Sequence, residues 1–374
     1  MFVSDSSPIN FGGKSSQETR PRCGVRPPGG LGSSSSRISR VIVLYNQTNY
    51  LIKGERRDLK ADQGVIICAH AVADALASVG LSVALVPIVD EVERALAPYS
   101  PTEWVVFNLG EGLAGKLFEE VRIAWALEAM GYRFTGADAV ALALTTHKAR
   151  AKRILRQAGV PTPDWRLFTS PRQVTEETLS GLSFPLIVKP VAEDASLGIT
   201  ELSVVNSLEA LRDRVDALVE RYRQAALVEQ FIDGREFNIS IWDHPPTVLP
   251  LAEVHFPKAK SLNERIVSFA AKWEEESIPY QNTPVTCPAE VSSALAEAIT
   301  LTALNAWQAL GCNGYGRVDM RIDQNGAPYV LEVNCNPDIS PDAGFFRSAS
   351  RAGYSYQEMV LHILQQVEVD KCPL

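Results

Sequence analysis

The sequence predicts an α/β protein in which an N-terminal domain built on a parallel sheet precedes a region with β-hairpins. Three observations lead to this prediction. The chain has 374 residues, 46% of them hydrophobic, which is enough for about two to three domains with large cores. Strand and helix patterns alternate between residues 40 and 140, as in a parallel sheet covered on both faces. Two strand-like runs, 316–323 and 328–334, flank Asn325-Gly326, which is a strong hairpin signal.

The N-terminal domain is predicted over residues 40–140. Its elements are, in order, a strand at 41–45, a helix at 61–79, strands at 81–87 and 104–108, and a helix at 116–130. Gly80 and Gly131 directly follow the two helices, and glycine commonly ends a helix because it adopts the left-handed conformation without steric cost. The order strand, helix, strand, strand, helix favours parallel strands with helices between them.

The rest of the chain is predicted to form a central lobe at 141–225 and a C-terminal lobe at 226–368. A basic helix at 147–157 is broken by the run GVPTP. The later elements are a strand at 185–190, a helix at 207–223, strands at 226–231, 236–242 and 247–256, a helix at 289–310, the hairpin, and a helix at 356–367.

Residues 1–39 differ in composition from the rest of the chain. They are rich in Ser, Gly, Pro and Arg and poor in apolar residues, so they cannot bury enough surface to offset the entropy of ordering. Three explanations stay open: a disordered extension, a start codon assigned too early, and an organelle transit peptide, which is also rich in Ser and Arg. Each of them makes this segment dispensable for the fold.

Charge and cysteine usage exclude several classes of function. The net charge is −8, whereas a nucleic-acid-binding protein carries a basic surface. The sequence has no apolar run of about 18 residues, so no transmembrane helix is expected. The cysteines form no C-x-x-C pair and give neither a zinc pattern nor a disulfide framework. We therefore predict a cytoplasmic protein with free thiols that binds neither nucleic acid nor a membrane.

Four polar side chains interrupt the apolar strands of the predicted C-terminal hairpin. Side chains alternate along a strand, so Arg317 shares a face with Asp319, and Glu332 shares a face with Asn334. If the strands pair, all four converge on one patch. Carboxylate and amide oxygens are hard ligands that suit Mg²⁺ carrying nucleotide phosphates. The alternative is a surface hairpin with solvated charges, the usual explanation of a short charged motif; the apolar strands around these residues favour the metal site.

A second candidate site follows the strand at 185–190. Lys189 is the penultimate residue of this apolar strand, and a loop of small residues with Ser196 and Gly198 comes after it. The ammonium group would offset phosphate charge, while the small residues let backbone N–H groups approach the phosphate oxygens. The alternative is a lysine that reaches solvent beside an ordinary surface loop.

The two motifs together resemble one known family. R-V-D with L-E-V-N-x-N-P in one hairpin, and V-K-P-x-x-E-x-x-S-x-G before it, are similar to the ATP-grasp superfamily and specifically to D-alanine–D-alanine ligase-like enzymes. The resemblance covers roughly residues 41–367 and is strongest at 185–337. It implies a two-lobed α+β ATP-grasp fold after the N-terminal domain, with ATP and two Mg²⁺ ions. Asp319, Glu332 and Asn334 would hold the metal, for which Mn²⁺ is an alternative.

The resemblance also assigns the nucleotide contacts. It implies that Glu229 accepts from the adenine amino group, that the backbone of Ile232 bonds the ring edge, and that Glu236 holds the ribose hydroxyls. Lys148 matches the first ATP-contacting lysine of the family, and Lys272 matches a lysine on a mobile lid. For either lysine alone, a solvated surface role is the alternative.

The family joins a carboxylate to an amine. The carboxylate takes the γ-phosphoryl group of ATP, and the amine then displaces phosphate from the carbonyl carbon. Enzymes promote phosphoryl transfer mainly by positioning and by offsetting charge. The resemblance implies a catalytic set of Arg317, Lys272 and Ser196, in which Arg317 stabilises the acyl phosphate and then the tetrahedral oxyanion.

The sequence departs from the family pattern around the amino-acid substrates. The family has a G-G-x-S-x-E motif after its first strand, whereas residues 45–50 here carry no such acid. Ala195 and Trp273 replace a serine and a tyrosine, so the three side chains that latch the lid are absent as a set. Asp338 replaces the glycine of N-x-x-P-G and would repel the carboxylate of an incoming amino acid. The alternative is that Asp338 points outward and only its N–H faces the pocket.

The sequence thus predicts an ATP-dependent carboxylate–amine ligase that forms an amide, dipeptide-like bond between small amino-acid or carboxylate substrates other than the usual D-alanine pair. One alternative is an authentic D-alanine–D-alanine ligase of cell-wall synthesis. Another is a non-catalytic nucleotide-binding module, which the complete set of metal ligands and phosphate lysines disfavours. The sequence does not set the stereochemistry of the substrates or the oligomeric state, and a homodimer is one option.

Overall fold

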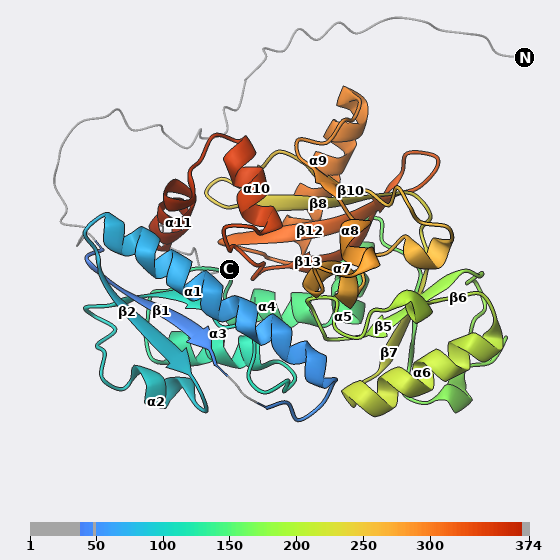
Figure 1. Ribbon diagram of the computed structural model, residues 1–374, viewed down its shortest axis with the longest axis horizontal. Coiled ribbons are helices and arrows are strands. Elements are labelled where there is room, and N and C mark those ends of the chain that lie inside the picture. Colours follow the sequence, from blue (N-terminus) through green and yellow to red (C-terminus); the bar gives the residue numbers. More distant parts are fainter. Residues whose placement is uncertain (1–37, 48–49, 369–374) are drawn as a thin grey trace, which may run out of the picture. The chain divides into compact units, whose positions relative to one another are not determined.

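The structure, a computed structural model, describes residues 38–47 and 50–368. Its N-terminal part is a three-stranded parallel sheet in the order β2-β1-β3, of which β1 and β2 are labelled in Figure 1. The strands are β1 (Arg40–Asn46), β2 (Ser82–Ile88) and β3 (Val105–Leu109). The predicted parallel α/β arrangement is therefore confirmed. The extension predicted at residues 1–39 lies outside the described residues, apart from its last two positions.

Helices cover both faces of this sheet. They are α1 (Leu59–Ser78), α2 (Val92–Leu96) and α3 (Glu119–Ala129). Along β1, Val41 and Val43 belong to the core that includes α1, whereas Ile42 and Leu44 belong to the core that includes α3. A strand buried on both faces needs a continuous apolar run, and the sequence VIVLY of β1 supplies it.

A four-stranded antiparallel sheet follows, in the order β4-β7-β5-β6. Its strands are β4 (Trp165–Phe168), β5 (Leu186–Pro190), β6 (Val204–Val205) and β7 (Ala226–Gln230). Helix α6 (Leu208–Tyr222) covers it with Leu211, Val215 and Leu218, whose spacing of four and three residues puts them on one side of the helix. The sheet therefore has one apolar face covered by a helix.

Strand pairing shows to which sheet β7 belongs. Residue 226 was expected to begin the C-terminal lobe, but β7 lies between β4 and β5 in the four-stranded sheet. The change of sheet falls after β7, where the chain enters β8 (Arg235–Trp242). The division of the chain into three domains itself stays a prediction.

The C-terminal sheet has six strands, ordered β11-β10-β8-β12-β13 with β9 also paired to β8. The strands after β8 are β9 (Thr247–Val248), β10 (Ala252–Val254), β11 (Val285–Thr286), β12 (Tyr315–Ile322) and β13 (Pro328–Asn334). Helix α9 (Ser293–Ala309) packs on it through Ile299, Ala303 and Trp307. Gly316 of β12 makes this packing possible, because a Cβ there would lie 2.5 Å from the Trp307 ring.

The remaining α-helices lie around the space between the two antiparallel sheets or form the C-terminal end of the described chain. They are α4 (Ala139–Thr146), α5 (Lys148–Gln157), α7 (Phe269–Trp273), α8 (Ile278–Gln281), α10 (Gly344–Arg351) and α11 (Tyr356–Gln365). Within residues 38–47 and 50–368, no helix is both long and apolar enough to cross a membrane.

Candidate active site

Two adjoining cavities lie between the four-stranded and six-stranded sheets. The large cavity, about 1450 Å³, is lined by β5, the end of β7, the hairpin β12–β13 and the connection between β10 and α8. The small cavity, about 140 Å³, is lined also by the loops that follow β1 and β3. The residues that line both cavities are Gly64, Glu193, Asp194, Ala195, Lys272, Trp273 and Asp338.

The hairpin β12–β13 pairs its four polar residues across the two strands, with a register shift between Asp319 and Met320. Arg317 pairs with Asn334, and Asp319 pairs with Glu332, in the antiparallel register. The guanidinium of Arg317 donates to both carboxylate oxygens of Asp319, at 2.7 and 2.8 Å. Asn238 of β8 also donates to Asp319, at 2.7 Å. Asp319 is therefore held in place from two strands.

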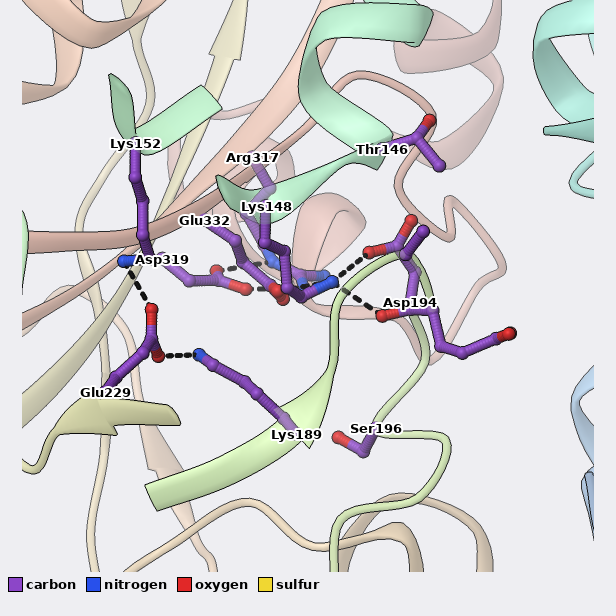
Figure 2. A network of polar contacts seen from close by, with 12 residues as sticks. Thr146, Lys148, Lys152, Lys189, Asp194, Ser196, Glu229, Arg317, Asp319 and Glu332 are labelled. Carbon is purple, nitrogen blue, oxygen red and sulfur yellow. Dashed lines mark hydrogen bonds and ion pairs between the residues drawn. The ribbon is translucent and has the colours of Figure 1, made fainter. Parts of the chain in front are cut away.

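Glu332 is paired with a different cation. Lys148 Nζ, from the first residue of α5, lies 3.2 Å from Glu332 and 3.0 Å from Asp194 (Figure 2). Burial disfavours the charged form of Glu332, but Lys148, Lys189 and Arg317 outweigh it and lower the pKa of this carboxyl to about 2. Burial likewise disfavours the Lys148 ammonium, and Asp194 and Glu332 outweigh it and raise its pKa. Both groups are charged at neutral pH.

Glu229 lies between two lysines. Its carboxylate is 2.6 Å from Lys152 Nζ and 2.5 Å from Lys189 Nζ. Figure 2 shows both lysines pointing toward it. Glu229 is fully buried, and although burial favours its neutral form, the two lysines lower its pKa. Burial lowers the pKa of Lys152 to about 8 against the opposing effect of Glu229. Lys189 lines the large cavity and can therefore face a ligand.

Glu236 and Ile232 are held by Arg321. The guanidinium donates to Glu236 Oε2 at 2.9 and 2.7 Å and to the carbonyl of Ile232 at 2.9 Å. All three residues line the large cavity. Arg321 follows Asp319 by two positions on β12, so it lies on the same face of the strand.

Asn334 is set apart from the two carboxylates. Asp319 and Glu332 line the large cavity, whereas Asn334 lines the small one. Its Oδ1 accepts the backbone N–H of Asn336 at 2.8 Å, which leaves this oxygen a second lone pair. The structure thus brings two of the three predicted metal ligands together in one cavity and places the third beside it.

The donor set fits Mg²⁺ in its chemistry. Two facing carboxylates and a nearby amide oxygen are hard donors, and Mg²⁺ in nucleotide sites uses one or two carboxylates together with phosphate oxygens. Among the described residues, no three His, Cys, Asp or Glu side chains gather as a complete metal site. The fit therefore depends on oxygens that a phosphate ligand would bring.

The connection between β10 and α8, residues 255–277, forms a lid segment over the cavities. It carries Lys272 on α7, and burial together with the positive charge of Arg317 lowers the pKa of this lysine. Ser196 lines the large cavity, and its hydroxyl donates to the carbonyl of Val267 in the lid segment at 2.9 Å. Ser196, on the loop after β5, and Lys272, on the lid segment, therefore both lie near the place where this loop contacts the lid segment.

Asp338 lies at the boundary of the two cavities and lines both. Its Oδ1 accepts the backbone N–H of Ser340 at 2.9 Å and also the Ser340 hydroxyl. Burial raises the pKa of the Cys68 thiol, and the negative charges of Asp338 and Glu111 raise it further. Asp338 therefore lies at the boundary of the cavities with its carboxylate bound to Ser340, and its role toward an acceptor stays a prediction.

Two residues of this network were missed in the sequence. Lys152 follows Lys148 by four positions on the basic helix, so both lie on one side of α5. Arg321 follows Arg317 and Asp319 at the spacing that keeps residues on one face of a strand. The four-residue spacing from Lys148 on the helix and the strand alternation that placed Asp319 could have identified both.

Comparisons with known proteins identify what the chain resembles. Residues 154–365, more than half of the chain, match the family model described as D-ala D-ala ligase C-terminus. The uncharacterised protein y4sG of Sinorhizobium fredii is 35% identical over 71% of this chain and 75% of its own length. The D-alanine–D-alanine ligase of Nitrosomonas europaea is 34% identical over 68% of this chain and 77% of its own.

A solved structure shows the same fold. The crystal structure of D-alanine–D-alanine ligase from Bacillus anthracis complexed with ATP aligns with a TM-score of 0.68, covering 88% of this chain and 97% of that one. The sequence identity in this alignment is 22%, so the likeness concerns the fold. The predicted combination of an N-terminal α/β domain with two ATP-grasp lobes is confirmed by it.

Proposed function

The chain belongs to the D-alanine–D-alanine ligase family of ATP-grasp ligases, and from this we propose that it is an ATP-dependent carboxylate–amine ligase whose substrates differ from the usual pair of D-alanine molecules. The observation that carries the proposal is a difference between the two cavities in the charged residues that line them. The large one gathers Lys148, Lys189 and Arg317 against carboxylates. Asp338 stands at its boundary with the small one.

ATP is proposed to lie in the large cavity. Lys148, Lys189 and Lys272 line it and would offset the charge of the phosphates. Glu229, which Lys189 contacts at 2.5 Å, would accept from the adenine amino group, and the N–H of Ile232 would bond the ring edge. The cavity volume of about 1450 Å³ exceeds the roughly 300–1,000 Å³ of ordinary ligand pockets, so a second substrate fits beside the nucleotide.

Glu236 is proposed to hold the ribose. Arg321 donates both of its hydrogen bonds with this residue to Oε2, which leaves Oε1 to accept from the ribose hydroxyls. The same arginine donates to the carbonyl of Ile232, so one side chain orients two of the proposed nucleotide contacts. This arrangement costs no reorganisation when the nucleotide binds.

Asp319, Glu332 and Asn334 are proposed to hold Mg²⁺, which when bound supplies charge neutralisation for the triphosphate. Arg317 is proposed to stabilise the phosphorylated carboxylate and then the oxyanion formed by the attacking amine. Its position suits this role because Asp319 fixes the guanidinium by two hydrogen bonds. A preorganised donor of this kind is among the strongest sources of catalysis in acyl transfer.

Asp338 is proposed to exclude D-alanine as acceptor. Its carboxylate would oppose the carboxylate of an incoming amino acid, and each 1.4 kcal/mol of such repulsion costs about tenfold in binding. The acceptor amine would then lack a carboxylate at this point or carry a cationic group toward Asp338. The second candidate, an authentic D-alanine–D-alanine ligase, is favoured by relatives of that name at 34% identity.

A screen of carboxylate and amine pairs for ATP-dependent phosphate release tests the proposal. We expect one or more pairs without D-alanine to exceed D-alanine alone in kcat/KM by at least tenfold. If D-alanine alone gave about 10⁴ M⁻¹ s⁻¹ or more, within the ordinary range of enzymes, the second candidate would be correct. Failure of every pair, with the nucleotide bound, would indicate a nucleotide-binding module.

A further inference from the structure

The last residue of α7, Trp273, touches two separate parts of the chain. Its indole N–H donates to the carbonyl of Ala195 at 2.9 Å. Its ring lies against Gly64 of α1, where an added Cβ would be 3.2 Å from the ring atom Cζ3. Trp273 therefore joins the lid segment both to the loop after β5 and to the N-terminal domain.

The loop after β5 is shaped for this contact. Ala195 and Ser196 have φ values of +55° and +59°, which non-glycine residues rarely adopt. Beside the indole bond, the Ser196 hydroxyl donates to the carbonyl of Val267, and the N–H of Phe269 donates to the carbonyl of Ile199, both at 2.9 Å. In each of these three bonds the acceptor is a backbone carbonyl.

The indole bond needs no side-chain partner at position 195. The sequence lacks the serine, tyrosine and glutamate that latch the lid in the resembled family, and this predicted a lid without a latch. The structure instead pairs a long donor, the indole, with the backbone of an alanine. Gly64 leaves the space that the larger ring requires.

Lys272 lies beside this contact. It precedes Trp273 directly, and its Nζ lies 5.1 Å from the centre of the indole ring, within the range of a cation–π interaction. Both residues line both cavities. Helix α7 has only five residues, and a helix this short is held by its contacts rather than by its own hydrogen bonds.

We propose that Trp273 is a positioning residue, which holds the lid segment against Ala195 and Gly64 so that Lys272 stays at the boundary of the two cavities while ATP is bound. The inference rests on the proposed function, because that function assigns Lys272 to the phosphates. The inference adds the contact through which Trp273 holds Lys272 in place, and it names Ala195 and Gly64 as the two positions that accommodate this contact.

The test uses the full chain with three substitutions. Trp273→Phe keeps a ring and removes the indole N–H. Gly64→Ala keeps the N–H and places a methyl group against the ring. Trp125→Phe is the matched control, because this tryptophan of α3 is 67% exposed and lines neither cavity. Each protein is examined for melting temperature, affinity for Mg·ATP, kcat with an active substrate pair, and protection of residues 255–277 from proteolysis by Mg·ATP.

We expect Trp273→Phe to bind Mg·ATP within threefold of the unaltered chain, to melt at the same temperature, and to lose at least tenfold in kcat together with the protection of the lid segment. Gly64→Ala should change in the same direction, and Trp125→Phe should not change. Unaltered kcat and protection in Trp273→Phe would overturn the inference, as would absence of protection in the unaltered chain. Protection without turnover for any pair would overturn the proposed function and leave the inference intact.

Discussion

Asp319 and Glu332 are directly opposite residues of the antiparallel pair β12–β13, and each carboxylate is held by a different cation, Asp319 by Arg317 and Glu332 by Lys148. Without a ligand, the charges of the site are therefore compensated within the protein. A bound triphosphate would pair with these cations. They can leave the two carboxylates only if another positive charge offsets the carboxylates. A divalent metal does so, which makes nucleotide affinity depend on Mg²⁺.

The first prediction concerns this dependence. Glu332→Gln removes one anionic ligand and should lower ATP-dependent phosphate release by more than about 100-fold, because even partners outside the ligand shell cost 10- to 100-fold in metal affinity. Phosphate release is measured over a titration of MgCl₂. Glu103→Gln is the control, since Glu103 is exposed and pairs with Arg40 in a surface bridge. Unchanged release and Mg²⁺ dependence in Glu332→Gln would remove this residue from the metal role.

The second prediction separates two lysines that share one carboxylate. Lys152→Met leaves Glu229 with Lys189 alone, and breaking a buried ion pair costs about 3–5 kcal/mol, so we expect a loss of about 2–3 kcal/mol in the free energy of unfolding while one partner remains. Lys189→Met should instead chiefly weaken ATP binding, because of the two lysines only Lys189 lines the cavity. Urea unfolding and ATP titration of both variants measure these two effects. An equal loss of ATP affinity in both variants would contradict the assignment of different roles to the two lysines.

The third prediction is a dependence of stability on pH. Burial and the charge of Asp194 raise the pKa of Glu120 from 4.5 to about 8. A carboxyl whose folded pKa is raised stabilises the fold fully below its unfolded pKa, and this contribution is lost as the pH rises through about 8. Glu120→Gln should abolish this loss. The difference in free energy of unfolding, Glu120→Gln minus unaltered chain, should therefore increase by roughly 1 kcal/mol per pH unit between pH 6 and 8. Parallel curves for the two proteins over this range would show that Glu120 is already ionised.

The fourth prediction concerns acceptor choice. Asp338→Asn removes the charge and keeps an oxygen that can accept from Ser340, so the local turn is preserved. We expect kcat/KM for D-alanine as acceptor to rise at least tenfold. Asp342→Asn is the matched control, because Asp342 lines the large cavity but not the small one. An equal rise in both variants would point to the overall charge of the cavity rather than to Asp338.

Local periodicity accounts for much of what the sequence predicted. The hairpin β12–β13 follows from alternation and from the turn residues Asn325 and Gly326, but its register does not, because a β-bulge shifts the pairing between Asp319 and Met320 so that Asp319 faces Glu332 rather than Leu331. Lys189 lies in a strand whose sequence is one continuous apolar run up to the lysine. Such features depend only on neighbours in the sequence, so the positions of Asp319, Glu332 and Lys189 on their strands could be predicted from the residues alone.

Contacts between distant segments were not predictable in this way. Lys152 and Glu229 are 77 positions apart in the sequence, and their pairing depends on how α5 packs behind β7. Helix α4, with the sequence AVALALTT, was not predicted because a short apolar run fits a buried strand as well as a helix. The bond from Trp273 to Ala195 uses a backbone carbonyl, so no residue type at position 195 indicates it.

The most direct test of the central claim follows an oxygen atom from the acid substrate. The acid of the most active pair is labelled with ¹⁸O in its carboxylate, and the inorganic phosphate released during turnover with ATP is analysed by mass spectrometry. A carboxylate that takes the γ-phosphoryl group leaves one of its oxygens on the phosphate when the amine attacks, so the account predicts one ¹⁸O atom per phosphate and one amide per ATP consumed. Phosphate without label, formed at the same rate when the amine is omitted, would show that water attacks ATP and would contradict the account.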